Sequence, residues 1–126
     1  MNILLVDDSY TMRNIEKKVL SRALPEAVFV EAADGLEGLA AIAAEPAGFG
    51  LMIIDWNMPN LDGIGLVTKI RETDKKTLII MATTEAEKTQ VLLAIRAGVS
   101  NYVVKPFSAE SLIAKVTQTL AKAKAA

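Results

Sequence analysis

The fold is decided by residues 51–63, which read LMIIDWNMPNLDG. Four apolar residues lead to a carboxylate at Asp55, and the chain then passes through a proline and an Asp-Gly pair typical of turns. A dense apolar run of this length indicates a short strand that is covered on both faces. We therefore interpret Asp55 as the residue at the carboxyl end of a buried strand, and Asp62-Gly63 as a turn.

Other short runs have the same character, and segments of helical length and period separate them. The predicted strands are Ile3–Val6, Val28–Val30, Leu51–Ile54, Leu78–Ala82 and Tyr102–Val104; the predicted helices are Thr11–Leu24, Leu36–Glu45, Ile64–Glu72, Glu85–Ala97 and Leu112–Ala123. Such an alternation predicts an α/β fold, a three-layer α/β/α sandwich. Its five-stranded parallel sheet would have the flavodoxin-like order 2-1-3-4-5.

Residues at the predicted boundaries support this division. Asp34 followed by Glu37 predicts a capping box at the start of the second helix, and Ser108 is a suitable cap for the fifth. Gly98 suits a left-handed helix end after the fourth helix.

Composition excludes several kinds of function. The 126 residues include no cysteine and no histidine, so disulfides, thiolate nucleophiles, cysteine-type zinc sites and a histidine base are absent. A net charge of -1 with 5% aromatic residues argues against nucleic acid as a partner. Charged residues interrupt every apolar run before the ~20 residues that a bilayer requires, and the N-terminus does not have the features of a secretory signal. We expect one cytoplasmic domain, residues 1–126, without membrane insertion.

Polar residues stand where the predicted strands end, which is where open α/β sheets bind their ligands. These residues are Asp7 and Asp8 after the first strand, Asp55 after the third, Thr83 and Thr84 after the fourth, and Lys105 and Pro106 after the fifth. The first and third strands are neighbours in this order, so three carboxylates share one cleft. At ~5 Å and an effective dielectric near 20, each carboxylate pair repels by about 3 kcal/mol. Oxygen ligands of this kind favour Mg²⁺, because one lysine does not balance three negative charges.

Each of these residues also has a purely structural interpretation. An aspartate or threonine at a strand end can simply cap the next helix, and a lone lysine can be a solvated side chain. A shared site is favoured because all of them fall at corresponding ends of different strands. A carboxylate beside a divalent cation can attack phosphorus and form an aspartyl phosphate, for which no histidine is needed in this chain.

Four motifs, in this order and spacing, resemble the receiver domains of two-component response regulators over nearly the whole chain. They are Leu5–Ser9 (LVDDS), Thr11–Arg13 (TMR), Asp55–Gly63 (DWNMPNLDG) and Tyr102–Phe107 (YVVKPF). The resemblance implies a phosphorylation-controlled signalling switch that catalyses only its own phosphorylation and dephosphorylation. It also implies that Asp55 is the phosphoacceptor, and that Asp8 and the Asn57 backbone carbonyl join it in binding Mg²⁺, with Asp7 acting through a water.

The same resemblance implies a mechanism for the switch. Thr83 matches the hydroxyl that moves toward the phosphoryl group, and Tyr102 matches the aromatic residue that then swings inward. Lys105 matches the lysine that pairs with the phosphorylated site, and the family's cis Lys-Pro bond is expected at residues 105–106. One departure is Thr84, which stands where the family mostly has alanine or glycine and which narrows the approach to Asp55.

The resemblance further implies partners and an output surface. The phosphoryl donor would be a histidine kinase, and a phosphatase is a further candidate partner of what we expect to be a monomer. The output surface would comprise the fourth helix, fifth strand and fifth helix, which bind the flagellar motor switch protein in chemotaxis members. The matching positions are Lys88, Val91, Ile95, Tyr102, Val104 and Lys115.

Alternative functions remain at the level of sequence. The chain can be a phosphorelay shuttle, or a receiver domain cut from a longer regulator, although it ends at Ala126, just past the fifth predicted helix. A Mg²⁺-dependent aspartate phosphatase is disfavoured, because such enzymes carry Asp-x-Asp after the first strand and need a substrate cap. A flavodoxin-like FMN module is disfavoured because Asp7 and Asp8 would repel the cofactor phosphate.

Overall fold

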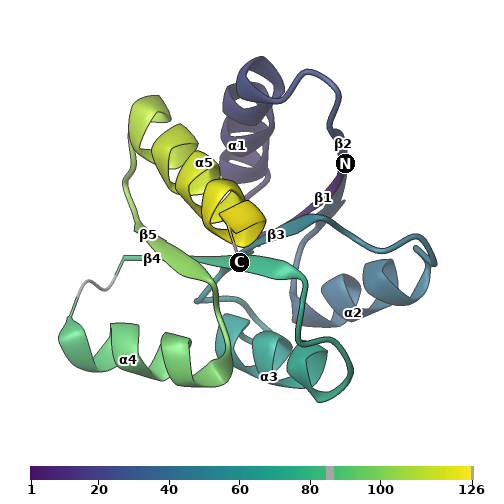
Figure 1. Ribbon diagram of the computed structural model, residues 1–126. Helices are drawn as coiled ribbons and strands as arrows, with labels where there is room; N and C mark the ends of the chain where they lie inside the picture. Colours follow the sequence, from purple (N-terminus) through teal and green to yellow (C-terminus); the bar gives the residue numbers. More distant parts are fainter. Residues whose placement is uncertain (85–86, 126) are drawn as a thin grey trace.

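The computed structural model describes residues 1–84 and 87–125, which form alternating strands and helices (Figure 1). The strands are β1 (Asn2–Val6), β2 (Val28–Ala32), β3 (Leu51–Asp55), β4 (Leu78–Thr83) and β5 (Asn101–Val104). The helices are α1 (Tyr10–Ala23), α2 (Gly35–Ala43), α3 (Gly63–Thr73), α4 (Lys88–Ala97) and α5 (Ala109–Ala125). All four strand pairings are parallel, and the order is β2-β1-β3-β4-β5. The predicted fold class and strand order are therefore confirmed.

The sheet lies between two helical layers. Helices α1 and α5 cover one face, and α2, α3 and α4 cover the other (Figure 1). Because successive side chains of a strand point to opposite faces, each strand contributes to two separate cores. This explains why the strands are continuously apolar.

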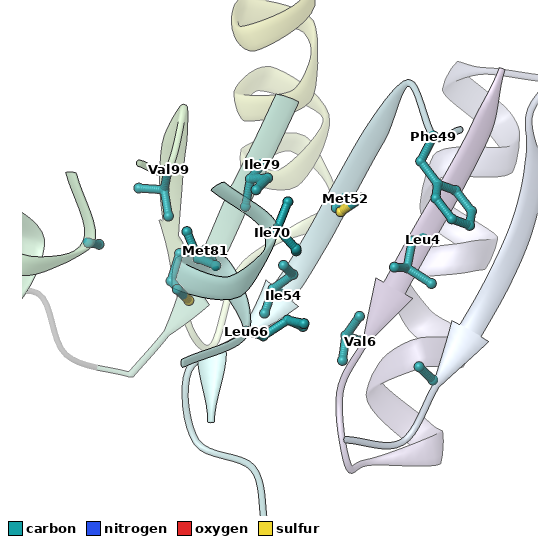
Figure 2. Close-up of a cluster of buried hydrophobic side chains, with 13 residues drawn as sticks. Leu4, Val6, Phe49, Met52, Ile54, Leu66, Ile70, Ile79, Met81 and Val99 are labelled. Atoms are coloured by element: carbon teal, nitrogen blue, oxygen red, sulfur yellow. The ribbon is translucent and has the colours of Figure 1, made fainter. Parts of the chain in front are cut away.

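The core on the α2–α4 side is drawn in Figure 2, where Leu66 and Ile70 of α3 lie against Val6 and Ile54 of the sheet. The core on the α1 and α5 side contains Leu5 and Ile53 of the sheet, Leu20 of α1, and Leu112 and Val116 of α5. Strands β1, β3 and β4 are thus buried on both faces, while β2 at the sheet edge leaves Val28 exposed.

The helix ends follow the predicted chemistry with one adjustment. The Asp34 carboxylate accepts the Glu37 N–H at 2.8 Å, and the Glu37 carboxylate reaches back to the N–H of Ala33, one residue before the cap. Ser108 accepts the Ser111 N–H at 3.0 Å, and Gly98 ends α4 with a φ of 112°. The capping prediction is confirmed at all three places.

Several boundaries differ from the prediction. Helix α5 begins at Ala109, three residues before the predicted start at Leu112, because the cap at Ser108 and not the first buried residue determines where a helix starts. The described part of α4 begins at Lys88, and the predicted start at Glu85 lies outside the described residues. Within residues 1–84 and 87–125, no helix is both long enough and apolar enough to cross a bilayer.

Substitution of Ile53 tests how much the core on the α1 and α5 side contributes to stability. It is 1% exposed in the central strand β3, so Ile53→Ala should lower the free energy of unfolding by about 2–4 kcal/mol through lost burial and a residual cavity. Urea denaturation measures this change. Ile15→Ala is the matched control, because Ile15 is 43% exposed on α1, and it should cost less than about 1 kcal/mol. Equal effects of the two substitutions would contradict the assigned core.

Candidate phosphoacceptor and metal site

Three carboxylates meet at the carboxyl edge of the sheet, as the strand order predicts. Asp7 follows β1, Asp55 ends β3, and one oxygen from each of Asp7, Asp8 and Asp55 lies within 4.8 Å of the others. Asp7 and Asp55 are buried, whereas Asp8 is exposed. Burial raises the pKa of Asp55, and the nearby charges of Asp7 and Asp8 raise it further, while Lys105 opposes both effects. The edge therefore has a strong excess of negative charge.

Lys105 joins two of these carboxylates directly. Its Nζ donates to Asp7 Oδ2 at 2.8 Å and to Asp55 Oδ1 at 2.9 Å, and its side chain is only 13% exposed. Burial alone would lower the pKa of Lys105, but its hydrogen bonds to the two aspartates outweigh burial and leave that pKa raised. Lys105 is therefore a charged partner of the site and not a solvated lysine. The Lys105-Pro106 bond is cis, as predicted.

The β1–α1 connection holds Asp7 from several sides. Asp7 Oδ1 accepts the Ser9 N–H at 2.8 Å, and the Ser9 hydroxyl in turn caps α1 by accepting the Met12 N–H at 3.1 Å. Arg13 donates to the Asp7 carbonyl oxygen at 2.6 Å and pairs with Glu31 of β2 at 3.0 Å. Ser9 is therefore the cap of α1, and the Asp7 carboxylate remains available to Lys105.

The β3–α3 connection fixes the backbone on either side of Asp55. The Trp56 N–H donates to Ala82 of β4 at 3.0 Å, and the Gly63 N–H donates to the Trp56 carbonyl oxygen at 2.8 Å. A Cβ on Gly63 would lie 2.5 Å from the Asp55 carbonyl oxygen, so only glycine allows this approach. Asp62 caps α3 by accepting the Gly65 N–H at 2.8 Å, which agrees with its interpretation as a local structural residue.

The remaining predicted residues lie around this cluster in different environments. Asn57 is exposed in the loop two residues after Asp55. Thr83 is buried at the end of β4, and its carbonyl oxygen accepts the Lys105 N–H at 2.7 Å, while Thr84 is exposed. A backbone hydrogen bond between the ends of adjacent strands therefore joins Thr83 and Lys105.

Tyr102 and the predicted output positions lie on α4, β5 and α5. Tyr102 is half-buried in β5, packs against the core on the α2–α4 side, and has the Lys115 Nζ of α5 4.7 Å from its ring centroid. On α4, Lys88 and Ile95 are exposed and Val91 is half-buried. Val104 and Lys115 are half-buried as well. The sequence reasoning did not single out Leu92 and Leu93, which are also exposed on α4.

The sequence reasoning also missed a buried glutamate on α1. Glu16 of α1 is 1% exposed, and its Oε1 has no hydrogen-bond partner. Burial, followed by the charge of Asp7, raises the pKa of Glu16 to about 8. The available signal was helical spacing, because Glu16 precedes the buried Leu20 by one turn and so shares its face.

A cavity of about 580 Å³ lies elsewhere, beside the first residues of β4 and β5 and the last turns of α5. None of the carboxylates lines it. The cavity is therefore separate from the carboxylate cluster.

The chain is similar to known proteins over nearly its whole length. Residues 3–117 match the family model described as response regulator receiver domain. The chain is 45% identical to "Chemotaxis protein CheY1" of Helicobacter pylori over 95% of this chain and 97% of that protein. The solved structure of chemotaxis response regulator CheY4 of Vibrio cholerae has a TM-score of 0.84 and 33% identity, covering 94% of this chain and 97% of that one. A two-component system response regulator/GGDEF domain protein has a TM-score of 0.88 and 28% identity over 98% of this chain, which spans only 50% of its length.

Glu16 makes stability depend on pH. Because folding raises its pKa from 4.5 to about 8, its contribution to stability is complete below about pH 4.5 and is lost as the pH rises through about 8. The glutamine of Glu16→Gln cannot ionise, so in metal-free buffer at pH 8.5 the free energy of unfolding of this variant should exceed that of the wild type by on the order of 5 kcal/mol. Urea unfolding between pH 5 and 8.5 measures the difference. Glu72→Gln on the exposed face of α3 is the control, and parallel pH profiles for wild type and Glu16→Gln would contradict the prediction.

Proposed function

The chain belongs to the response regulator receiver domain family, and we propose that it is a phosphorylation-controlled signalling switch of a two-component system. In this proposal residues 1–126 form one receiver domain, and Asp55 accepts a phosphoryl group from a histidine kinase. The observation that carries the proposal is the placement of Asp55 in a cluster of three carboxylates, hydrogen-bonded to the half-buried Lys105 at the carboxyl edge of the sheet.

The residues at the edge fit a divalent cation. Their donor atoms are oxygens, and three carboxylates against one ammonium leave uncompensated negative charge. Asp8, Asp55 and the Asn57 carbonyl would hold Mg²⁺, with Asp7 contributing through a water. The cation would supply charge neutralisation for an incoming phosphoryl group.

Asp55 would perform the chemical step as a nucleophile. Its carboxylate oxygen forms a bond to phosphorus while the nitrogen–phosphorus bond of the kinase phosphohistidine breaks, and the departing imidazole takes a proton from solvent. Lys105 already bonds to Asp55 and would pair with the added phosphoryl oxygens. Because the histidine is supplied by the kinase, the chain needs none of its own, and it catalyses only its own phosphorylation and dephosphorylation.

The signal would leave through α4, β5 and α5. A phosphoryl group on Asp55 offers a new acceptor to the Thr83 hydroxyl, and the space that this side chain vacates would admit the Tyr102 ring. Thr83 and Tyr102 lie on adjacent strands, which supports such coupling, since Thr83 pairs with Val104 and Met81 with Tyr102 in the β4–β5 register. The exposed Thr84 would influence access to Asp55 and hence the reaction rates.

The target would be the flagellar motor switch. The names of the curated relatives, which are chemotaxis proteins of similar length, support this assignment. The protein would act in the cytoplasm as a monomer, and a phosphatase would reset it. One observation favours a second candidate, a receiver domain that serves a longer regulator or a phosphorelay: the chain also matches half of a response regulator/GGDEF domain protein.

Phosphorylation is tested with a small donor. Incubation with Mg²⁺ and acetyl phosphate should add one phosphoryl group to the intact mass and change Trp56 fluorescence, and Asp55→Asn or removal of Mg²⁺ should abolish both. Asp62→Asn is the matched control, because this aspartate only caps α3 and asparagine retains that function. An unchanged mass, or sustained turnover of simple phosphate esters, would refute the proposed switch.

The output surface is tested by binding. A motor switch peptide should bind the phosphorylated protein, and Ile95→Ala should weaken this binding by about tenfold, since a large exposed side chain of the surface is truncated. Ile15→Ala on α1, which lies on the other face of the sheet, is the control and should bind like the wild type. Fluorescence anisotropy measures both. Equal affinity of the two variants would exclude this surface as the one that contacts the motor switch and would favour the relay alternative.

A further inference from the structure

Glu16, on the buried face of α1, has no role in the proposed reaction. Glu16 and Leu20 are the two buried residues of this helix, and they lie one turn apart on the face that covers the sheet. The core on this side is otherwise formed by aliphatic side chains such as Leu5 and Ile53. A charged carboxylate is costly in such surroundings, and Glu16 Oε1 has no hydrogen-bond partner to offset that cost.

The charges that act on Glu16 come from the candidate site and from its own helix. Asp7 after β1 and Asp55 of β3 oppose its ionisation, while Lys105 after β5 and Arg13 of α1 favour it. Helix α5, which also packs on α1, contributes buried side chains without ionisable groups: Leu112, Val116 and Thr119. Among the residues that the structure describes, the acidic groups that act on Glu16 are therefore Asp7 and Asp55 of the carboxylate cluster.

This coupling acts through space. In the described part of the chain, no hydrogen bond or ion pair joins Glu16 to Asp7, Asp8 or Asp55. Side chains of an α-helix lean toward its N-terminus, and the N-terminus of α1 follows Asp7 and Asp8 at the carboxyl edge. Glu16 therefore lies on the buried face of α1, within the two turns of this helix that follow Asp7 and Asp8.

We propose that Glu16 carries a proton in the metal-free protein and releases it to solvent when a divalent cation binds to the Asp7, Asp8 and Asp55 cluster. This inference rests on the proposed function for the presence of the cation, and it adds Glu16 as a residue that sets the affinity of the site for that cation. The charge balance is simple: two positive charges enter the site, one proton leaves Glu16, and the solvent buffer takes up that proton.

The physical reason lies in the charge at the edge of the sheet. Three carboxylates and one ammonium leave two negative charges there, and ionisation of Glu16 would add a third beneath them. Burial, the largest cause of the raised pKa of Glu16, is unchanged by a cation. A divalent cation cancels the first two charges, however, so the repulsion from Asp7 and Asp55 that raises this pKa further disappears while the attraction of Lys105 and Arg13 remains. The ionised Glu16 would then add attraction for the bound cation, and cation affinity should increase as the pH rises through the neutral range.

Isothermal titration of the metal-free protein with MgCl₂ at pH 7, in two buffers of different ionisation enthalpy, counts the released protons. The wild type should release between about half a proton and one proton per Mg²⁺, and Glu16→Gln should release close to none. Between pH 6.5 and 8 the affinity of the wild type should rise severalfold per pH unit, whereas that of Glu16→Gln should stay level. Glu72→Gln on the exposed face of α3 is the matched control and should behave like the wild type.

Two further measurements keep the test decisive. Glu16→Met preserves side-chain length and replaces Glu16→Gln if circular dichroism shows that the latter does not fold. Carbon-13 NMR of the Glu16 carboxyl in the unmodified protein should change from the protonated to the ionised shift when Mg²⁺ is added at pH 7.

The outcomes separate this inference from the proposed function. Proton release that is lost with Glu16 supports the inference. Binding of Mg²⁺ with no proton release, or with equal release from Glu16→Gln, would overturn it and leave the phosphoacceptor function intact. No binding of Mg²⁺ in the millimolar range would overturn both the inference and the metal site of the proposed function.

Discussion

Repulsion among three carboxylates at one edge of the sheet is the constraint on which the polar structure of this chain depends. The parallel pairing of β1 with β3 brings the strand ends together, so Asp7 and Asp55 cannot move apart without breaking the sheet. Lys105 offsets part of this repulsion by bonding to both buried carboxylates. The apolar cores on both faces provide the stability that allows such an unfavourable arrangement to persist, because single strands buried on two sides contribute far more than one ion pair.

Two kinds of interaction hold the residues of the site in place. Local bonds fix individual loops: Ser9 caps α1 and donates to Asp7, and Gly63 allows the backbone after Asp55 to turn back closely. Long-range bonds join elements that are distant in sequence, and Lys105 connects the loop after β5 to β1 and β3. Of these hydrogen bonds, only the one from Lys105 to Asp55 ends on the Asp55 carboxylate, so it is the one that a change of charge at Asp55 affects directly. A chemical change at Asp55 therefore acts first on the loop that follows β5, next to the surface formed by α4, β5 and α5.

The sequence alone predicts most of the fold, because the strands are uninterrupted apolar runs and their carboxyl ends carry conspicuous polar residues. It also predicts which residues share the edge, since parallel order brings Asp7, Asp8, Asp55 and Lys105 together whatever the details of the loops. The sequence does not predict which residues of α1 are buried, because this depends on how the helix is rotated against the sheet. In α1 the apolar Ile15 is exposed and its acidic neighbour Glu16 is buried, which reverses the expectation from residue type. The sequence includes Arg13 in a motif but does not predict its hydrogen bonds, because its acceptors are the Asp7 backbone carbonyl and the carboxylate of Glu31 on another strand.

The repulsion among the carboxylates at the edge of the sheet also affects the buried Glu16. Because Glu16 is buried and its Oε1 has no hydrogen-bond partner, its ionisation lowers the free energy of unfolding. A ligand that removes the unfavourable interactions of the ionised group restores that stability to the protein when it binds. Placing acidic groups together lowers the stability of the unliganded protein. A ligand that neutralises these groups removes their repulsion, and this relief adds to the free energy of binding. An edge built from neutral side chains would fold more stably, but a cation or a phosphoryl group would then change little in its energy. The unfavourable electrostatics of the unliganded protein are, for this reason, what makes its carboxyl edge responsive to added charge.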